Sequence, residues 1–123
     1  MNSKATLRLA LKFNSVSMSV VLASIASAAI ADSVEDMCKK SSEICSCAAR
    51  QLKSDVGDAD YGLYEAVGSA YIASQATGMS MGDAWDAAVK AESNQRGSGF
   101  GETLSKTNAI GKAHRKAIRA CAE

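Results

Sequence analysis

The sequence has 123 residues, of which 47% are hydrophobic and 22% are charged, and its formal net charge is +1. This length fits one small domain, and the apolar fraction excludes a chain that is disordered throughout. A net charge this close to zero excludes a strongly basic nucleic-acid binder, so we expect no nucleic-acid partner.

The first part of the sequence has the pattern of a secretory signal. Three basic residues, Lys4, Arg8 and Lys12, come before an apolar stretch over 16–31, and no acidic residue lies among them. The stretch ends in the small-x-small sequence of residues 29–31, which is typical of a signal-peptidase site. This pattern predicts a secretory signal peptide that is cleaved off.

Cleavage there would divide the sequence into a signal peptide over 1–31 and a single helical domain over 32–123. Three of the 14 basic residues belong to the signal, so the domain would keep 11 of them beside all 13 acidic residues, a formal charge of −2. The apolar stretch is short for a membrane span, so we expect no stable membrane insertion after cleavage. The signal looks bacterial, so we expect a periplasmic protein; secretion into the medium is the alternative.

Four stretches of the domain carry apolar residues at every third or fourth position, which is typical of helices with one buried face. No stretch shows the alternation of a half-buried strand. We therefore expect an all-α fold, a small disulfide-stapled bundle of about four helices. The expected helices cover residues 33–54, 60–77, 81–93 and 102–122.

Smaller features predict how these helices begin, end and pack. Ser33 with Asp36 resembles a capping box, and the breaker run 94–101 predicts a flexible loop. Gly68 and Gly111 lack side chains, so we expect them to let neighbouring helices approach closely.

The tyrosines and the single tryptophan are the aromatic residues of interest. We expect Tyr64 and Tyr71 in the core. Tyr61 and Trp85 fit either the core, which is the more common place, or the exposed anchors of a binding surface.

Helix geometry limits how the four cysteines can pair. Cys38 and Cys45 would lie about 10.5 Å apart along an unbroken helix, whereas a disulfide needs Cα atoms within about 7 Å. Cys45 and Cys47 would point to nearly opposite sides of that helix. Three cysteines on one intact helix therefore cannot bond each other, and only one of them can meet Cys121.

Two disulfide arrangements remain open. In the first, the helix begins only near Ser41 or Ser42, Cys38 bonds Cys45 or Cys47, and the other member of that pair bonds Cys121. In the second, the helix is continuous, Cys38 bonds Cys121, and the remaining two cysteines stay as a dithiol. An oxidising compartment favours two disulfides over free thiols, so we expect all four cysteines in disulfides.

Residues that could carry chemistry are few. Cys45, Cys47, His114 and the methionines Met79 and Met81 are soft ligands of the kind that select Cu(I), but their spacing lacks the paired Cys-x-x-Cys of structural zinc sites. His114 belongs to no known nucleophile–base motif, and we expect it to line a helix interface. We therefore predict no catalytic residue, no metal site and no cofactor, and a protein that is not an enzyme.

Basic residues gather on the last expected helix. Lys112, Arg115, Lys116 and Arg119 follow the i, i+3, i+4, i+7 spacing of one helix face, and we call them the basic ridge. Such a ridge could dock an acidic partner or an anionic headgroup. The plainer interpretation is a solvated face, partly neutralised by the acidic residues of the first helix.

These observations predict a small exported helical protein that acts as a binding or interaction module, such as an inhibitor, immunity or adaptor protein of the cell envelope. Its partner would be another envelope or secreted protein, held by the basic ridge. The alternative is a soft-metal (copper) or thiol-redox carrier that uses Cys45 and Cys47.

Overall fold

The computed structural model describes residues 32–123; the predicted signal peptide lies outside the described residues. Across this range the chain forms five helices and no strand, which confirms the all-α, disulfide-stapled fold with one helix more than expected. No helix of this range is both long enough and apolar enough to cross a membrane. The helices are α1 (Ser33–Cys38), α2 (Ser42–Val56), α3 (Asp58–Ala76), α4 (Met81–Arg96) and α5 (Phe100–Ala122).

The expectation of one continuous helix over 33–54 is wrong, because the chain breaks after Cys38. Lys39 takes the left-handed conformation with a φ of 58°, and Ser41 then caps α2 by accepting a hydrogen bond from its first turn. The break folds α1 back, which brings the Cα atoms of Cys38 and Cys45 to 5.5 Å. Apolar spacing continues across the break, so periodicity alone does not reveal it.

Two disulfides hold the helices together, and no cysteine of residues 32–123 is free. The Cys38–Cys45 bond ties α1 to α2. The Cys47–Cys121 bond, with a Cα–Cα distance of 6.0 Å, ties α2 to the last turn of α5. The arrangement with two disulfides is therefore confirmed, and the alternative of a Cys38–Cys121 bond beside a dithiol is wrong.

Helix ends differ from the expected positions by a few residues. Asp32, not Ser33, caps α1, because its Oδ1 accepts a hydrogen bond from the Val34 N–H at 2.9 Å. Both α4 and α5 extend into the breaker run 94–101. The loop shrinks to a tight turn because Gly97, with a φ of 66°, ends α4 in the left-handed region that glycine adopts without strain.

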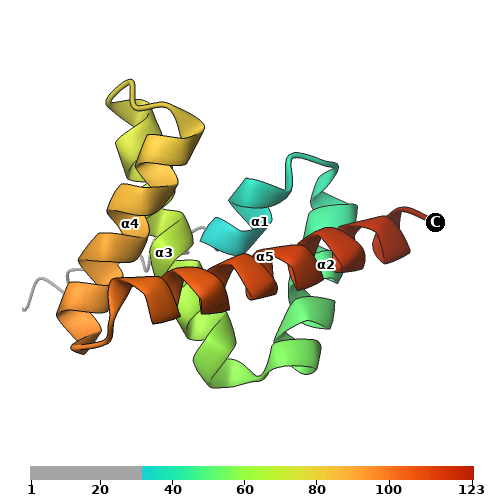
Figure 1. Ribbon diagram of the computed structural model, residues 1–123. Coiled ribbons are helices and arrows are strands. Elements are labelled where there is room, and N and C mark those ends of the chain that lie inside the picture. The colour runs from blue at the N-terminus through green and yellow to red at the C-terminus, as the bar shows by residue number, and fades with distance from the viewer. Residues whose placement is uncertain (1–31) are drawn as a thin grey trace, which may run out of the picture.

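The longest helix, α5, crosses the other helices and organises the fold (Figure 1). One part of α5 packs on the antiparallel α3–α4 pair and the other part packs on α2, while the α3–α4 turn projects away from α5. One buried cluster lies where α1, α2, α3 and α5 meet, and another lies between α3 and α4. The first contains Val34, Ala49, Leu52, Tyr61, Tyr64 and Ile110, and the second contains Leu63, Val67, Ala88 and Val89.

Gly68 allows the short α1 to lie close against α3, as expected. A Cβ at this position would lie 2.5 Å from Met37 Cε and 3.1 Å from Ser33 Oγ, so a larger residue would force at least the Met37 side chain to move. The Ser33 hydroxyl also donates a hydrogen bond of 2.6 Å to the Glu65 carbonyl oxygen. These contacts, with the disulfide to α2, place Met37 at the edge of the groove described next.

Candidate functional site

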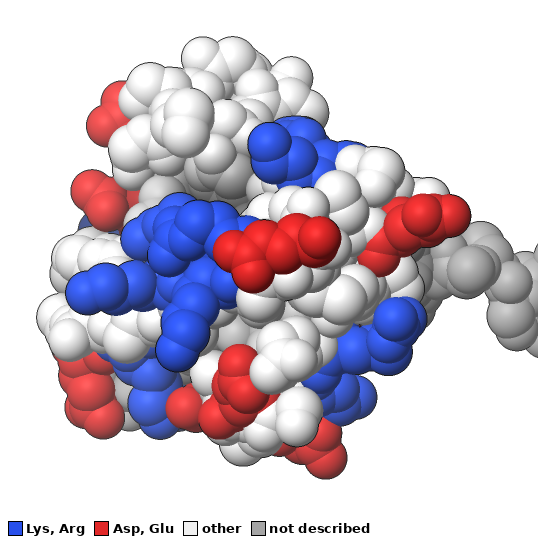
Figure 2. Space-filling view, turned by 90° about the vertical axis from the view of Figure 1, so that its right-hand side faces the viewer, with Lys and Arg blue, Asp and Glu red and all other residues white. Residues whose placement is uncertain are grey.

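The basic ridge lies exposed along α5, as the helical spacing predicted. Its four members, Lys112, Arg115, Lys116 and Arg119, are all exposed. The three salt bridges within residues 32–123 join other side chains, so none of these four is paired with a carboxylate there. Figure 2 shows a cluster of lysine and arginine side chains with both uncharged surface and acidic side chains beside it. Within residues 32–123 no ion pair joins the ridge to an acidic residue of the first expected helix, and partial neutralisation of a solvated face stays a prediction.

A groove of about 510 Å³ adjoins the ridge where α1, α3, α4 and α5 meet; we call it the aromatic groove. Met37 lines it from α1, Tyr71 from α3, and Met81 and Trp85 from α4. Arg115 belongs to both the groove and the ridge, so the two features form one continuous surface. The volume falls within the range of about 300–1,000 Å³ that is typical of small-molecule sites.

The α5 side of the groove is built on helical spacing. Asn108, Gly111, Arg115 and Ile118 are three or four residues apart and therefore share one face. A Cβ at position 111 would make only ordinary contacts, at 3.6 Å from Tyr64 Oη and 3.8 Å from the Arg115 guanidinium. Gly111 thus lines the groove at a place where a methyl group would fit without a clash. This corrects the expectation that it serves a tight helix–helix approach.

The aromatic rings of Trp85 and Tyr71 form the opposite wall, and the buried Tyr64 ring lies behind them. The Trp85 indole N–H donates a hydrogen bond of 3.0 Å to Asn108 Oδ1, which links α4 to α5. The Trp85 ring meets Tyr71 edge-on at 5.5 Å between centroids and meets Tyr64 at 6.1 Å. Edge-to-face pairs of this kind are favourable. Trp85 and Tyr71 are only partly buried, so both rings remain available at the groove.

Tyr64 and His114 form a polar pair in the floor. Tyr64 Oη and His114 Nδ1 share a hydrogen bond of 3.1 Å, and His114 is only 2% exposed. Its other nitrogen, Nε2, is buried without a hydrogen-bond partner in the described part of the chain. Burial lowers the pKa of His114 against the opposing charge of Asp32, and Arg115 lowers it as well. Burial raises the pKa of Tyr64 to about 12, so both groups are uncharged at neutral pH.

The structure does not assemble the soft ligands that the sequence offers. Cys45 and Cys47 are each bonded to a different cysteine, so their thiolates would form only after both disulfides are reduced. Met79 and Met81 are exposed near the α3–α4 turn, whereas His114 is buried as expected. Over residues 32–123, no group of three or more His, Cys, Asp or Glu side chains is arranged to hold a metal ion.

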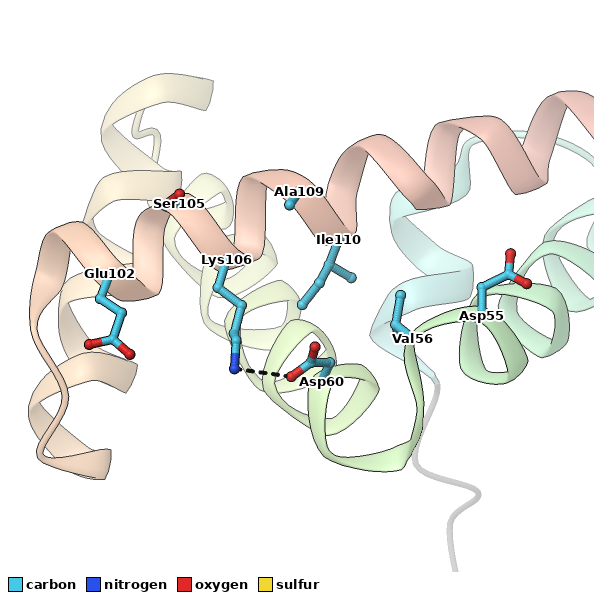
Figure 3. Close-up of a pocket in the computed structure, with 8 residues that line it drawn as sticks. All are labelled: Asp55, Val56, Asp60, Glu102, Ser105, Lys106, Ala109 and Ile110. Carbon is cyan, nitrogen blue, oxygen red and sulfur yellow. Dashed lines mark ion pairs between the residues drawn. The ribbon is translucent and has the colours of Figure 1, made fainter.

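A second hollow, of about 620 Å³, lies on another face of α5 (Figure 3). Lys106 Nζ lies 3.3 Å from Asp60 Oδ1, so its basic residue is already paired. Figure 3 shows Glu102 and Asp55 at opposite ends of the hollow, with Ile110 between them. No aromatic side chain lines this hollow. The aromatic groove, with its unpaired arginine, is therefore the better candidate for a site.

Sequence reasoning found the ridge but missed the groove. The sequence allows Trp85 as an exposed anchor, although burial is the more common place for it, and no pattern in the sequence indicates Asn108. Comparison with protein-family models, with curated proteins and with solved structures found no match for this chain. Function must therefore be inferred from the residues and their geometry.

Proposed function

We propose that this chain is a small exported binding protein, with the periplasm as its destination, and that its basic ridge docks an acidic partner protein of the cell envelope. Inhibitor, immunity and adaptor roles all require such a docking surface. Two disulfides in so short a domain support folding in an oxidising compartment outside the cytoplasm. The signal-peptide pattern of the first 31 residues supports the same destination.

The observation that carries this proposal is the unpaired state of the ridge. Four exposed cations share one helix face, and none is within salt-bridge distance of a carboxylate of residues 32–123. Their mutual repulsion costs free energy in the isolated chain, and an acidic partner would relieve it. Complementary charge of this kind speeds association and selects the partner.

A charge-reversal experiment tests the proposal. The exported protein would be used to capture partners from envelope extract, beside the variant Arg115→Glu/Arg119→Glu. We expect the wild type to capture a defined protein at low salt, and we expect reversal of the ridge to abolish capture, because attraction becomes repulsion. Added salt should weaken capture by the wild type, since salt screens exposed charges beyond about 10 Å at 0.1 M.

The matched control is Arg50→Glu/Lys90→Glu, which makes the same change in net charge at exposed residues outside the ridge. This control should capture the partner as the wild type does. Equal capture by all three proteins would mean that the ridge is merely solvated. Binding to anionic phospholipid vesicles with no protein captured would replace the partner protein with a membrane and contradict the proposal.

A further inference from the structure

Beyond docking a partner, we propose that the aromatic groove binds a small molecule that carries an apolar tail and one carboxylate. The tail would lie over Gly111 against the aromatic wall, and the carboxylate would meet Arg115. Arg115 is the only member of the ridge that lines the groove. The other three ridge residues lie outside the groove, so a substitution at one of them changes the ridge without changing the lining of the groove.

The residues that line the groove favour a ligand with an apolar part. Tyr71, Trp85, Met37, Met81 and Ile118 present aromatic and aliphatic surface from four helices. Met81 is 69% exposed, which is unusual for a methionine, and its flexible thioether can fold over a tail. A pocket that is mainly apolar, with a few polar groups to fix orientation, is the usual form of a small-molecule site.

The positive charge of Arg115 favours a ligand that carries a carboxylate. No aspartate or glutamate lines the groove, and His114 is uncharged at neutral pH because burial lowers its pKa. Arg115 therefore supplies the only charge in the lining, and no carboxylate of residues 32–123 pairs with it. An arginine guanidinium can bind a carboxylate through two parallel hydrogen bonds. A cationic ligand would meet no carboxylate there and would be repelled by Arg115.

Helix geometry sets the length of the tail. Arg115 and Asn108 are seven residues apart, or about 10.5 Å along α5 at 1.5 Å per residue. Gly111 lies between them and lines the groove without a side chain. A medium acyl chain or an aromatic ring with a short side chain fits this distance. Decanoate and 3-phenylpropanoate represent these two sources of the same chemistry.

The single tryptophan gives a direct readout of occupancy. Trp85 is the only tryptophan of the chain, so its indole N–H gives one resolved NMR signal and its emission reports on one place. The exported, disulfide-bonded protein would be titrated with decanoate, 3-phenylpropanoate and decylamine. We expect a saturable shift of the Trp85 signal with at least one carboxylate and none with decylamine, which has the same tail and opposite charge.

A chain-length series separates a filled groove from a surface contact. Burial of each further methylene contributes enough to strengthen binding about three- to fourfold. Affinity should therefore rise from hexanoate to octanoate to decanoate. Equal affinities along the series, or equal shifts with decylamine, would overturn the proposal, and so would the absence of any shift.

Two pairs of variants locate the ligand. Arg115→Gln should weaken carboxylate binding about tenfold or more, whereas Arg119→Gln removes the same ridge charge outside the groove and should change it little. Gly111→Ala should weaken binding several-fold because its methyl group occupies the floor. Gly62→Ala, at a helical glycine with no neighbour within 4 Å, is its control.

We expect Gly111→Ala to stay folded, because alanine favours the helix over glycine and its Cβ would make only ordinary contacts. Unchanged binding in both Arg115→Gln and Gly111→Ala would overturn the proposal. A Trp85 signal that shifts on dilution of the protein alone would place a second copy of the chain in the groove and would overturn it too.

Discussion

His114 is the single histidine of the chain, and its imidazole is enclosed in the floor of the groove with only the Tyr64 hydroxyl as partner. Burial of the ring lowers its pKa in the folded protein from the ordinary value of 6.5. A buried group of this kind links folding to pH, because the unfolded chain takes up a proton that the folded chain resists.

We therefore expect the free energy of unfolding to stay level above pH 6.5 and to fall as pH drops through 6.5 toward the folded-state pKa. In that window the unfolded state binds more protons, so acid favours it. Urea denaturation between pH 8 and pH 5.5 would measure the effect. The variant His114→Gln cannot titrate at this position. Its free energy of unfolding should be lower than that of the wild type but should not change with pH over this window. An equal slope in both proteins would contradict the assignment to His114.

The break between α1 and α2 is a feature of the helices that the apolar spacing of the sequence does not reveal. Val34, Met37, Ser41 and Ile44 keep the helical spacing, so the stretch is typical of one helix. The local sign of the break is the polar sequence before Ser42, but polar sequences of this kind also occur inside ordinary helices. The Ser41 cap marks the start of α2 locally, whereas the folding of α1 onto α3 and the Cys38–Cys45 bond, which hold the two helices apart in direction, are tertiary contacts.

Lys39 tests this account of the break. It is the only residue other than glycine with a positive φ in residues 32–123, and it ends α1 where glycine is preferred. Lys39→Gly should relieve the left-handed strain of about 1–2 kcal/mol, offset by the greater freedom of glycine in the unfolded chain. We expect a net stabilisation of up to about 1 kcal/mol, measured by urea denaturation. Lys40→Gly is the neighbouring control and should be no more stable than the wild type.

Element by element, the sequence predicted the helices better than the surfaces between them. The helical segments follow from periodicity, which acts locally, although the exact end of α4 at Gly97 does not. The basic ridge follows from spacing within α5 alone. The groove does not, because it needs Met37, Trp85 and Gly111, which lie on three different helices. No pattern in one segment predicts that they will meet.

For the molecule as a whole, the two disulfides differ in how much chain they close. The Cys38–Cys45 bond spans 7 residues and the Cys47–Cys121 bond spans 74. The entropy removed from the unfolded chain grows with loop length, so the short loop contributes about 2 kcal/mol and the long one about 4 kcal/mol. Cys47 is thus expected to matter more to stability than Cys38.

Paired serine variants test this ranking. Cys47→Ser/Cys121→Ser should lose about twice as much unfolding free energy in urea as Cys38→Ser/Cys45→Ser. The wild type should show no reactive thiol even when denatured, whereas a thiol signal would reopen the soft-metal and redox alternatives. A larger loss from the short loop would mean that the Cys38–Cys45 bond acts mainly by holding α1 in place.

The Cys47–Cys121 bond also encloses α3, α4, the turn at Gly97 and nearly all of α5 in one covalent ring. A protease that cuts the backbone anywhere inside this ring opens it but releases no fragment, since both pieces stay joined through sulfur. In the destination we propose, outside the cytoplasm, a molecule nicked by a protease would therefore keep its groove and its ridge together on one scaffold.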